Sequence, residues 1–418
     1  MGPTDESFVQ RHGLHTPAQL AGAEQVLREV EGRDLRTIRV LWVDQHGVPR
    51  GKFVSPATFR GSLTNGLDLS GAVINLDSAN RVFAAAFAEG GGVGIAELTG
   101  FPDVVIVPDP ATFRVLPWTD RTGWVLADAY FSNGRPHPLD GRGILRRQLA
   151  EAERLGFDYQ AGLEVEFYLL ARDPGRIAAH DLGQPPAPPP VSVLQHGYQF
   201  LSEVRLAALD AVLIPIRDAL LELGCNLRSF EDEWGPGQVE ATFAPEGGLS
   251  AADAMTLFRT TVKQVAAQHG VLATFMSWPA LPDVPSSGWH LHQSLLRDGR
   301  NLFASETETL SETGRQFAAG ILEHAVPMTI FTTPTITGYK RYRPYSFAPD
   351  NVNWAIENRG SMLRVQGGPG DRSTHLENRL GEPSANPYLY VAANVAAGLD
   401  GIRRGLTPPP MSGPDPYA

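Results

Sequence analysis

Residues 162–167 read Gly-Leu-Glu-Val-Glu-Phe, a strand-like stretch in which two carboxylates stand two residues apart among apolar neighbours. Because side chains alternate between the two faces of a strand, Glu164 and Glu166 are expected to point to the same face of a sheet. Taken alone, such a pair is typical of a solvated face, since carboxylates are normally exposed. The pair is evidence for a functional site only if similar pairs occur elsewhere in the chain.

Three further segments carry polar side chains in a comparable arrangement. Residues 233–240 place two glutamates around a Gly-Pro-Gly bend, and residues 287–294 place two histidines on one face of a predicted strand. Residues 375–379 repeat the two-residue spacing with an acid and a base. The residues concerned are Glu233, Glu240, His290, His292, Glu377 and Arg379.

These residue types together indicate a metal site. Several carboxylates gathered with one imidazole would repel one another unless cations lay among them, and this ligand type suits Mg²⁺ or Mn²⁺. Five arginines in the last fifth of the chain could hold phosphate or a substrate carboxylate through their guanidinium groups, although surface solubility is their ordinary role. They are Arg341, Arg343, Arg359, Arg364 and Arg379.

The rest of the chain mixes helical and strand patterns, which predicts an α+β fold with an antiparallel sheet. The pattern at residues 16–19 is a capping box with proline at the first helical position, and it predicts a helix that ends at Gly32. Strands are predicted at 37–43, 52–54, 103–107 and 163–170, and amphipathic helices at 140–155, 203–223 and 250–269.

Composition limits the class of protein. A chain of 418 residues is long enough for two or more domains, and it contains no apolar run near the roughly 20 residues that span a bilayer. The formal charge of −11 argues against binding to nucleic acid or anionic membranes. One cysteine, Cys225, and the lack of a secretory pattern at the N-terminus favour a cytoplasmic location.

The motifs, taken in this order, resemble the glutamine synthetase superfamily over residues 34–406, and its γ-glutamyl-amine ligase subgroup in particular. Residues 43–52 resemble the small N-terminal domain of the family, and residues 107–110 with 116–118 resemble its join to the catalytic domain. The resemblance implies a β-grasp-like domain at 1–110. It also implies a catalytic domain at 111–418, with a curved antiparallel sheet and flanking helices.

The resemblance further implies roles for individual residues beside ATP, glutamate and an amine. The implied ligands of one Mg²⁺ or Mn²⁺ ion are Glu166, Glu233 and Glu240, and those of the other are Glu164, His290 and Glu377. The implied nucleotide and phosphate contacts are His292, Ser294, Arg359 and Arg364, and the implied substrate contacts are Arg341 and Arg379. Asp68 stands in residues 67–71, which resemble only in part the family segment that assists amine binding from a neighbouring subunit, and a homo-oligomer with shared active sites is expected.

Several positions depart from the pattern of glutamine synthetases proper. Pro285-Ser286 replaces an Asn-Gly pair that contacts the amino acid, and His375 replaces an arginine that contacts the nucleotide. Residues 344–349 read Pro-Tyr-Ser-Phe-Ala-Pro and lack the acid that closes over ammonium. The usual C-terminal helices also have no counterpart, which weakens the expectation of the usual double ring of subunits.

These departures favour a ligase that uses ATP to form a γ-glutamyl amide, through an acyl phosphate, from an organic amine other than ammonia. Three alternatives remain at this point. They are a true glutamine synthetase that uses ammonia, a ligase or kinase for a different carboxylic acid, and a catalytically silent scaffold or regulator.

Overall fold

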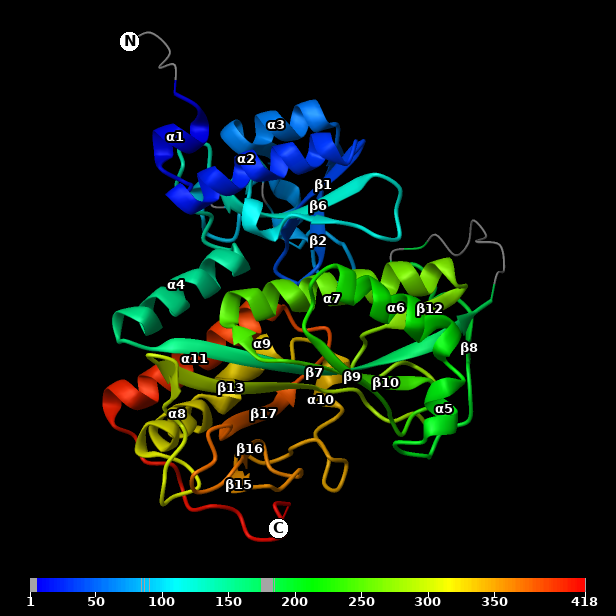
Figure 1. The fold of residues 1–418 in the computed structure, drawn as a ribbon, viewed down its shortest axis with the longest axis vertical. Coiled ribbons are helices and arrows are strands. Elements are labelled where there is room, and N and C mark those ends of the chain that lie inside the picture. The colour runs from blue at the N-terminus through cyan, green and yellow to red at the C-terminus, as the bar shows by residue number, and fades with distance from the viewer. Residues whose placement is uncertain are drawn as a thin grey trace. The chain divides into compact units, whose positions relative to one another are not determined.

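The computed structural model describes residues 6–83, 85, 87–89, 91–173, 183 and 185–417. The chain divides into two compact units, one comprising residues 1–144 with 175–188 and the other residues 145–174 with 189–418. Figure 1 shows a mixed α/β architecture with helices against each sheet. In the part of the chain that the structure describes, no helix is both long and apolar enough to cross a membrane.

The first unit is built on a six-stranded sheet in the order β2-β1-β6-β4-β3, with β5 pairing with β6. Strand β1 pairs antiparallel with β2, as the predicted hairpin requires, and parallel with β6. The strands are β1 (Thr37–Val43), β2 (Pro49–Val54), β3 (Leu67–Ser70), β4 (Asp103–Pro108), β5 (Arg114–Val115) and β6 (Thr122–Tyr130). The helices are α1 (Phe8–His12), α2 (Pro17–Gly32) and α3 (Pro56–Asn65), with 3₁₀ turns at Gly71–Asn75, Ala96–Leu98 and Pro110–Thr112.

Local chemistry explains these elements. The hydroxyl of Thr16 accepts the amide hydrogen of Gln19 at 3.2 Å, and the Gln19 side chain accepts that of Thr16, which completes the expected capping box at α2. In the turn of the hairpin, Asp44 accepts the amide hydrogens of His46 and Val48, each at 2.9 Å. The boundary expected near residue 110 lies inside this first unit, because β6 joins its sheet between β1 and β4.

The second unit contains an 11-stranded sheet whose main path runs β15-β16-β17-β13-β7-β10-β9. The strands are β7 (Asp158–Arg172), β8 (Val191–Val193), β9 (Leu227–Asp232), β10 (Gln238–Phe243), β11 (Glu246–Gly247), β12 (Val271–Thr274), β13 (Trp289–Arg297), β14 (Arg300–Asn301), β15 (Trp354–Ile356), β16 (Leu363–Gln366) and β17 (His375–Gly381). The helices are α5 (Glu203–Ala207), α6 (Asp210–Glu222), α7 (Gly248–Gln268), α8 (Glu312–Glu323), α9 (Ala325–Thr332), α10 (Ile336–Tyr339) and α11 (Pro387–Arg404), and α4 (Gly141–Arg154) begins in the first unit.

One expectation needs correction in the second unit. The helix expected over residues 203–223 is two helices, α5 and α6, because Leu209 between them leaves helical geometry with a ψ of 0° and buries its side chain. The sheet is antiparallel at nearly every pairing, but β15 and β16 are parallel.

One face of the large sheet packs against helices. Phe167 of β7 and Phe243 of β10 contact Phe258 of α7, and Trp289 of β13 contacts Tyr390 of α11. Because side chains alternate along each strand, the intervening polar residues all project from the opposite face. The fold thereby gathers them on one surface of the sheet.

Candidate active site

Strand pairing places the polar residues of the large sheet in register with one another. Glu164 of β7 lies opposite His290 of β13, and Glu166 lies opposite Glu240 of β10. The next strand continues the row, because Glu377 of β17 pairs with β13. The site is therefore built by four adjacent strands, β10, β7, β13 and β17.

The first cluster consists of Glu164, His290 and Glu377, whose potential metal-binding atoms all lie within 4.8 Å of one another. Nδ1 of His290 is 2.5 Å from Oε1 of Glu164 and 3.4 Å from Oε1 of Glu377. A register shift between Trp289 and Leu291 accompanies this approach. These three residues form one of the two expected ligand groups.

The second cluster consists of Glu166, Glu240 and His290, again within 4.8 Å of one another. His290 belongs to both clusters, so they share an edge. Glu233, the third residue expected beside Glu166 and Glu240, follows β9 and is half-buried, and the second cluster does not include it.

The electrostatics of the clusters differ. Burial, together with repulsion from Glu164 and Glu166, raises the pKa of Glu240 to about 11, and burial raises that of Glu233 to about 8. Burial also opposes ionisation of Glu377, but Arg379 beside it brings the pKa of Glu377 down to about 2. The carboxyl groups of Glu233 and Glu240 therefore resist ionisation without a cation. A bound cation would offset the repulsion and lower their pKa values.

Gln238 is a residue of this site to which the sequence analysis assigned no role. Its side-chain amide donates to Oε2 of Glu166 at 3.1 Å and to the carbonyl of Ser286 at 3.1 Å. The amide of Gly288 donates to the same Glu166 oxygen at 3.0 Å, and the Tyr168 hydroxyl donates to the carbonyl of Pro285 at 2.7 Å. The Pro285-Ser286 segment, one of the departures from the family pattern noted above, is thus connected through Gln238 to Glu166 of the carboxylate cluster.

Arg364 and Arg379 hold Glu377 from two sides. Nη1 of Arg364 donates to Oε2 of Glu377 at 3.1 Å, and Arg364 also pairs with Glu357, a contact that the sequence analysis missed. Nη1 of Arg379 donates to the other oxygen of Glu377, while its Nη2 donates to the carbonyl of Phe347 at 3.3 Å. The buried Nε of Arg379 has no hydrogen-bond partner among the described residues, so this guanidinium retains donor capacity.

Arg341 is buried beside the clusters. Its Nη1 donates to the carbonyl of Gly381 at 2.6 Å, and its buried Nε has no hydrogen-bond partner among the described residues. A methyl group at Gly288 would lie 2.7 Å from Nη2 of Arg341 and 2.9 Å from Nε2 of His290. The glycine therefore keeps open the narrow space between this arginine and the shared histidine.

The remaining predicted residues occupy different positions. Nε2 of His292 lies 2.9 Å from Oε2 of Glu164, and Nδ1 lies 3.0 Å from Nε2 of His375, so the histidine pair extends the first cluster. Ser294 is half-buried on the same face of β13, and Arg359 is exposed. Asp68 is exposed on β3 in the first unit, whereas the other predicted residues belong to the second unit.

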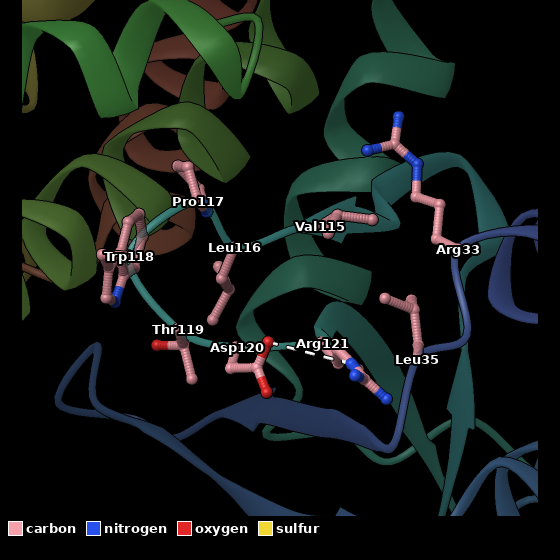
Figure 2. Close-up of a pocket in the computed structure, with 9 residues that line it drawn as sticks. All are labelled: Arg33, Leu35, Val115, Leu116, Pro117, Trp118, Thr119, Asp120 and Arg121. Carbon is pink, nitrogen blue, oxygen red and sulfur yellow. Dashed lines mark ion pairs between the residues drawn. The ribbon is translucent and has the colours of Figure 1, made fainter.

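Two cavities need to be distinguished from the carboxylate clusters. The larger, of about 650 Å³, belongs to the first unit and is lined by residues 115–121 with Arg33 and Leu35. Figure 2 shows that its ion pair joins Asp120 to the adjacent Arg121, and its lining includes none of the predicted site residues. We assign it no catalytic role. The smaller cavity, of about 280 Å³, belongs to the second unit and includes Arg359 in its lining.

Comparisons with known proteins agree with this geometry. Residues 138–418 match the family described as the catalytic domain of glutamine synthetase. The chain is 41% identical over 416 residues to a gamma-glutamylanilide synthase of Acinetobacter sp, with 97% of this chain and 83% of that protein covered. It is 33% identical to a glutamate–isopropylamine ligase of Pseudomonas sp, covering 91% of this chain and 80% of that protein.

A solved structure shows the same likeness in three dimensions. The GmaS/ADP complex in conformation 1 superposes with a TM-score of 0.76 at 28% identity, covering 94% of this chain and 84% of that one. The family match spans the whole large sheet and all four strands that carry the clusters. The chain belongs to the glutamine synthetase family.

Proposed function

We propose that this ligase uses ATP to join the γ-carboxylate of glutamate to an organic amine other than ammonia. One observation carries the proposal: a buried carboxylate and histidine cluster lies beside a loop that presents Tyr345 and Phe347 and has no acid at residues 344–349. The carbonyl of Phe347 accepts a hydrogen bond from Arg379, which ties this loop to the cluster. Relatives named gamma-glutamylanilide synthase and glutamate–isopropylamine ligase support an organic amine.

The donors of the two clusters fit the divalent metal on which the family depends. They are carboxylate oxygens with one imidazole, and they are buried so that their charges repel unless a cation is present. We propose that Glu164, His290 and Glu377 hold one Mg²⁺ or Mn²⁺ ion. Glu166 and Glu240, with Glu233 nearby in the chain, would hold the other. Bound cations would offset the repulsion between the γ-carboxylate and the phosphates of ATP.

The chain's own side chains account for the first step. An oxygen of the γ-carboxylate attacks the γ-phosphorus of ATP, the bond from that phosphorus to its bridging oxygen breaks, and ADP leaves. Arg364 and Arg379 are positioned to bind charge that develops on the transferring group, because both lie at Glu377. Arg341 would bind the α-carboxylate of glutamate through its unused donors.

The second step forms the amide. The nitrogen lone pair of the amine attacks the acyl carbon, the bond from carbon to the phosphate oxygen breaks, and inorganic phosphate leaves while the nitrogen loses a proton. An acyl phosphate hydrolyses in water, so the site must exclude solvent at this stage. The aromatic rings of Tyr345 and Phe347 would serve both needs, because they exclude water and contact an apolar substituent on the amine.

Further expectations from the sequence remain part of the proposal. His292 and Ser294, with Arg359, would contact the nucleotide, and Asp68 would act on the amine from a neighbouring subunit. The β-grasp-like domain would end with the first compact unit, near residue 144 and not at residue 110, and the catalytic domain would comprise the second unit. We further propose a homo-oligomer that works in the cytoplasm on small-molecule substrates.

The decisive test is ADP release by the purified protein with ATP, Mg²⁺ and glutamate, comparing ammonia with alkyl-, aryl- and polyamines and identifying each product by mass. We expect a γ-glutamyl amide with at least one organic amine and faster turnover than with ammonia. Ammonia outcompeting every organic amine would instead establish a glutamine synthetase. Activity with another acid alone would establish a different ligase, and silence with ATP binding intact would indicate a scaffold.

A further inference from the structure

The smaller cavity is formed by two segments that lie far apart in the sequence. Tyr345 and Phe347 line it together with Pro416 and Tyr417, which belong to the tail, defined here as residues 406–417 after α11. The ring centroids of Tyr345 and Tyr417 are 5.0 Å apart, with an angle of 50° between the ring planes. The tail thus supplies part of an aromatic wall.

Hydrogen bonds hold the tail in this position. The indole nitrogen of Trp354 donates to the carbonyl of Pro409 at 2.7 Å, and the amide of Ser412 donates back to the carbonyl of Trp354 at 3.0 Å. The side chain of Asn353 donates to the carbonyl of Pro416 at 2.7 Å. Tyr417 is therefore presented by an anchored segment, which lowers the cost of ordering it around a ligand.

A hydrogen bond links the lining of the cavity to the catalytic cluster. Arg379, which holds Glu377, also donates to the carbonyl of Phe347, a lining residue. The hydroxyl of Tyr417 donates to the carbonyl of Ala348 at 3.4 Å, in the same loop. The loop that lines the cavity is therefore hydrogen-bonded to Arg379, which is proposed to bind the transferring phosphoryl group.

The loop that faces the tail has an unusual backbone. Tyr345 and Phe347 have φ angles of 60° and 59°, although bulky residues rarely adopt positive φ. The two residues are nevertheless 72% and 61% exposed. Such conformations persist where the surrounding structure enforces them, and they concentrate at ligand sites. The loop thus leaves two aromatic residues, Tyr345 and Phe347, exposed and available to contact a ligand.

The lining of the cavity carries little charge of its own. Of the seven described residues that line it, Arg359 alone is charged, and it is a cation. The nearby carboxylate of Asp415 already accepts from the hydroxyl of Tyr345 and the amide of Tyr417, each at 2.9 Å. An alkylamine is protonated at neutral pH, and Arg359 and the Asp415 carboxylate act on that charge in opposite senses, so the aromatic lining and not the charge favours an aromatic substituent. An arylamine is neutral, because its nitrogen lone pair is delocalised into its ring.

We infer that the tail forms one wall of an arylamine subsite and that Tyr417 determines the preference for an aromatic substituent. This inference rests on the proposed function and adds the class of amine and the residue that selects it. The ring of the substrate would pack among Tyr345, Phe347 and Tyr417, with its amino group directed toward Arg379 and the acyl carbon.

The test compares aniline with isopropylamine as substrates of wild type, Tyr417→Ala and Tyr417→Phe. We expect wild type to prefer aniline, and Tyr417→Ala to lose about tenfold in kcat/KM for aniline through a higher KM, with the KM for ATP unchanged. Tyr417→Phe keeps the ring and should stay within about twofold of wild type. Met411→Ala, in the same tail but outside the lining, is the matched control.

A second variant changes the position of the tail without changing Tyr417 itself. A methyl group at Gly360 would lie 2.6 Å from Cγ of Pro416 and 3.0 Å from the ring of Tyr417, so Gly360→Ala should displace the tail and lower aniline turnover in the same direction. If both variants leave the ratio of aniline to isopropylamine turnover unchanged, the inference is overturned. Preference of wild type for isopropylamine would overturn it too. If wild type forms no γ-glutamyl amide with any amine, the proposed function itself fails.

Discussion

Nδ1 of His290 lies 2.5 Å from Oε1 of Glu164, and the two residues face each other on the neighbouring strands β13 and β7. The second oxygen of Glu164 lies 2.9 Å from Nε2 of His292. One carboxylate is thus shared by two imidazoles at the centre of the cluster. Although burial opposes its ionisation, these histidines hold the pKa of Glu164 well below its ordinary value. The group is therefore anionic at neutral pH, as a metal ligand requires.

Replacing Glu164 should abolish most activity while preserving the fold. Glu164→Gln keeps the volume and one acceptor oxygen but removes the charge, so we expect a loss of about 100-fold or more in kcat/KM and weaker activation by Mg²⁺. Steady-state kinetics across a metal titration would measure both effects. Glu323→Gln, at the exposed end of α8, is the control and should match wild type. Near-normal kinetics of Glu164→Gln would remove Glu164 from the site.

Metal removal should destabilise the protein. Saturating Mg²⁺ or Mn²⁺ at about 100 times the Kd should add about 2.7 kcal/mol per site that is absent from the unfolded chain. Thermal unfolding of chelator-treated protein, with and without added metal, measures this increment. With its pKa raised to about 11, Glu240 must take up a proton when the metal-free protein folds at neutral pH; Glu240→Gln avoids that cost, so its metal-free form should be more stable than metal-free wild type and should respond less to metal. Equal responses of the two proteins would contradict a role for Glu240.

Asp140 should make stability depend on pH. Burial, with repulsion from Asp128, raises the pKa of Asp140 to about 7 from its ordinary value of 3.8. The native state then binds a proton more tightly than the unfolded state, so its contribution is full below pH 3.8 and is lost as the pH rises through about 7. Asp140→Asn should flatten the change in unfolding free energy between these pH values.

Urea unfolding at several pH values measures the slope of that change. Asparagine can still accept from the indole nitrogen of Trp42, but its amide would face the amide of Ala129, so the variant is expected to be less stable overall. The diagnostic quantity is therefore the slope with pH and not the absolute stability. Asp103→Asn, at an exposed position of β4, should leave the slope as in wild type. An unchanged slope in Asp140→Asn would show that another group dominates.

Arg341 should govern the affinity for the acid substrate. Arg341→Lys keeps the charge but loses the planar fork of donors, so we expect the KM for glutamate to rise by about tenfold or more while ATP binding persists. Arg343→Lys provides a matched control two residues away, because Arg343 stacks on Trp278, 4.6 Å from the ring centroid. A rise in KM for ATP instead of glutamate would place Arg341 on the nucleotide side.

Much of the local structure followed from short patterns. The capping box at Thr16, the hairpin after Thr37 and the strand around Glu164 all occur as expected, because each depends on neighbours within a few residues. The helix over residues 203–223 was predicted wrongly as continuous. Its apolar spacing carries no information on whether Leu209 turns into the core, which depends on distant packing.

The candidate site, too, was predicted only in part from local patterns. The spacing of Glu164 with Glu166 predicted that each pair shares a strand face, but no local pattern pointed to Gln238 as the donor that holds Glu166. Glu357 was also missed, because its pairing with Arg364 depends on how β15 and β16 are placed beside each other.

The sequence by itself determined which side chains project from the same face of each strand, since alternation is a property of neighbouring residues. Only the tertiary structure decided which strands are neighbours and in what register, so that His290 is shared by two carboxylate clusters. It also decided that Tyr417 returns to Tyr345. Contacts between residues so far apart in the chain depend on the packing of the whole unit, which local spacing does not encode.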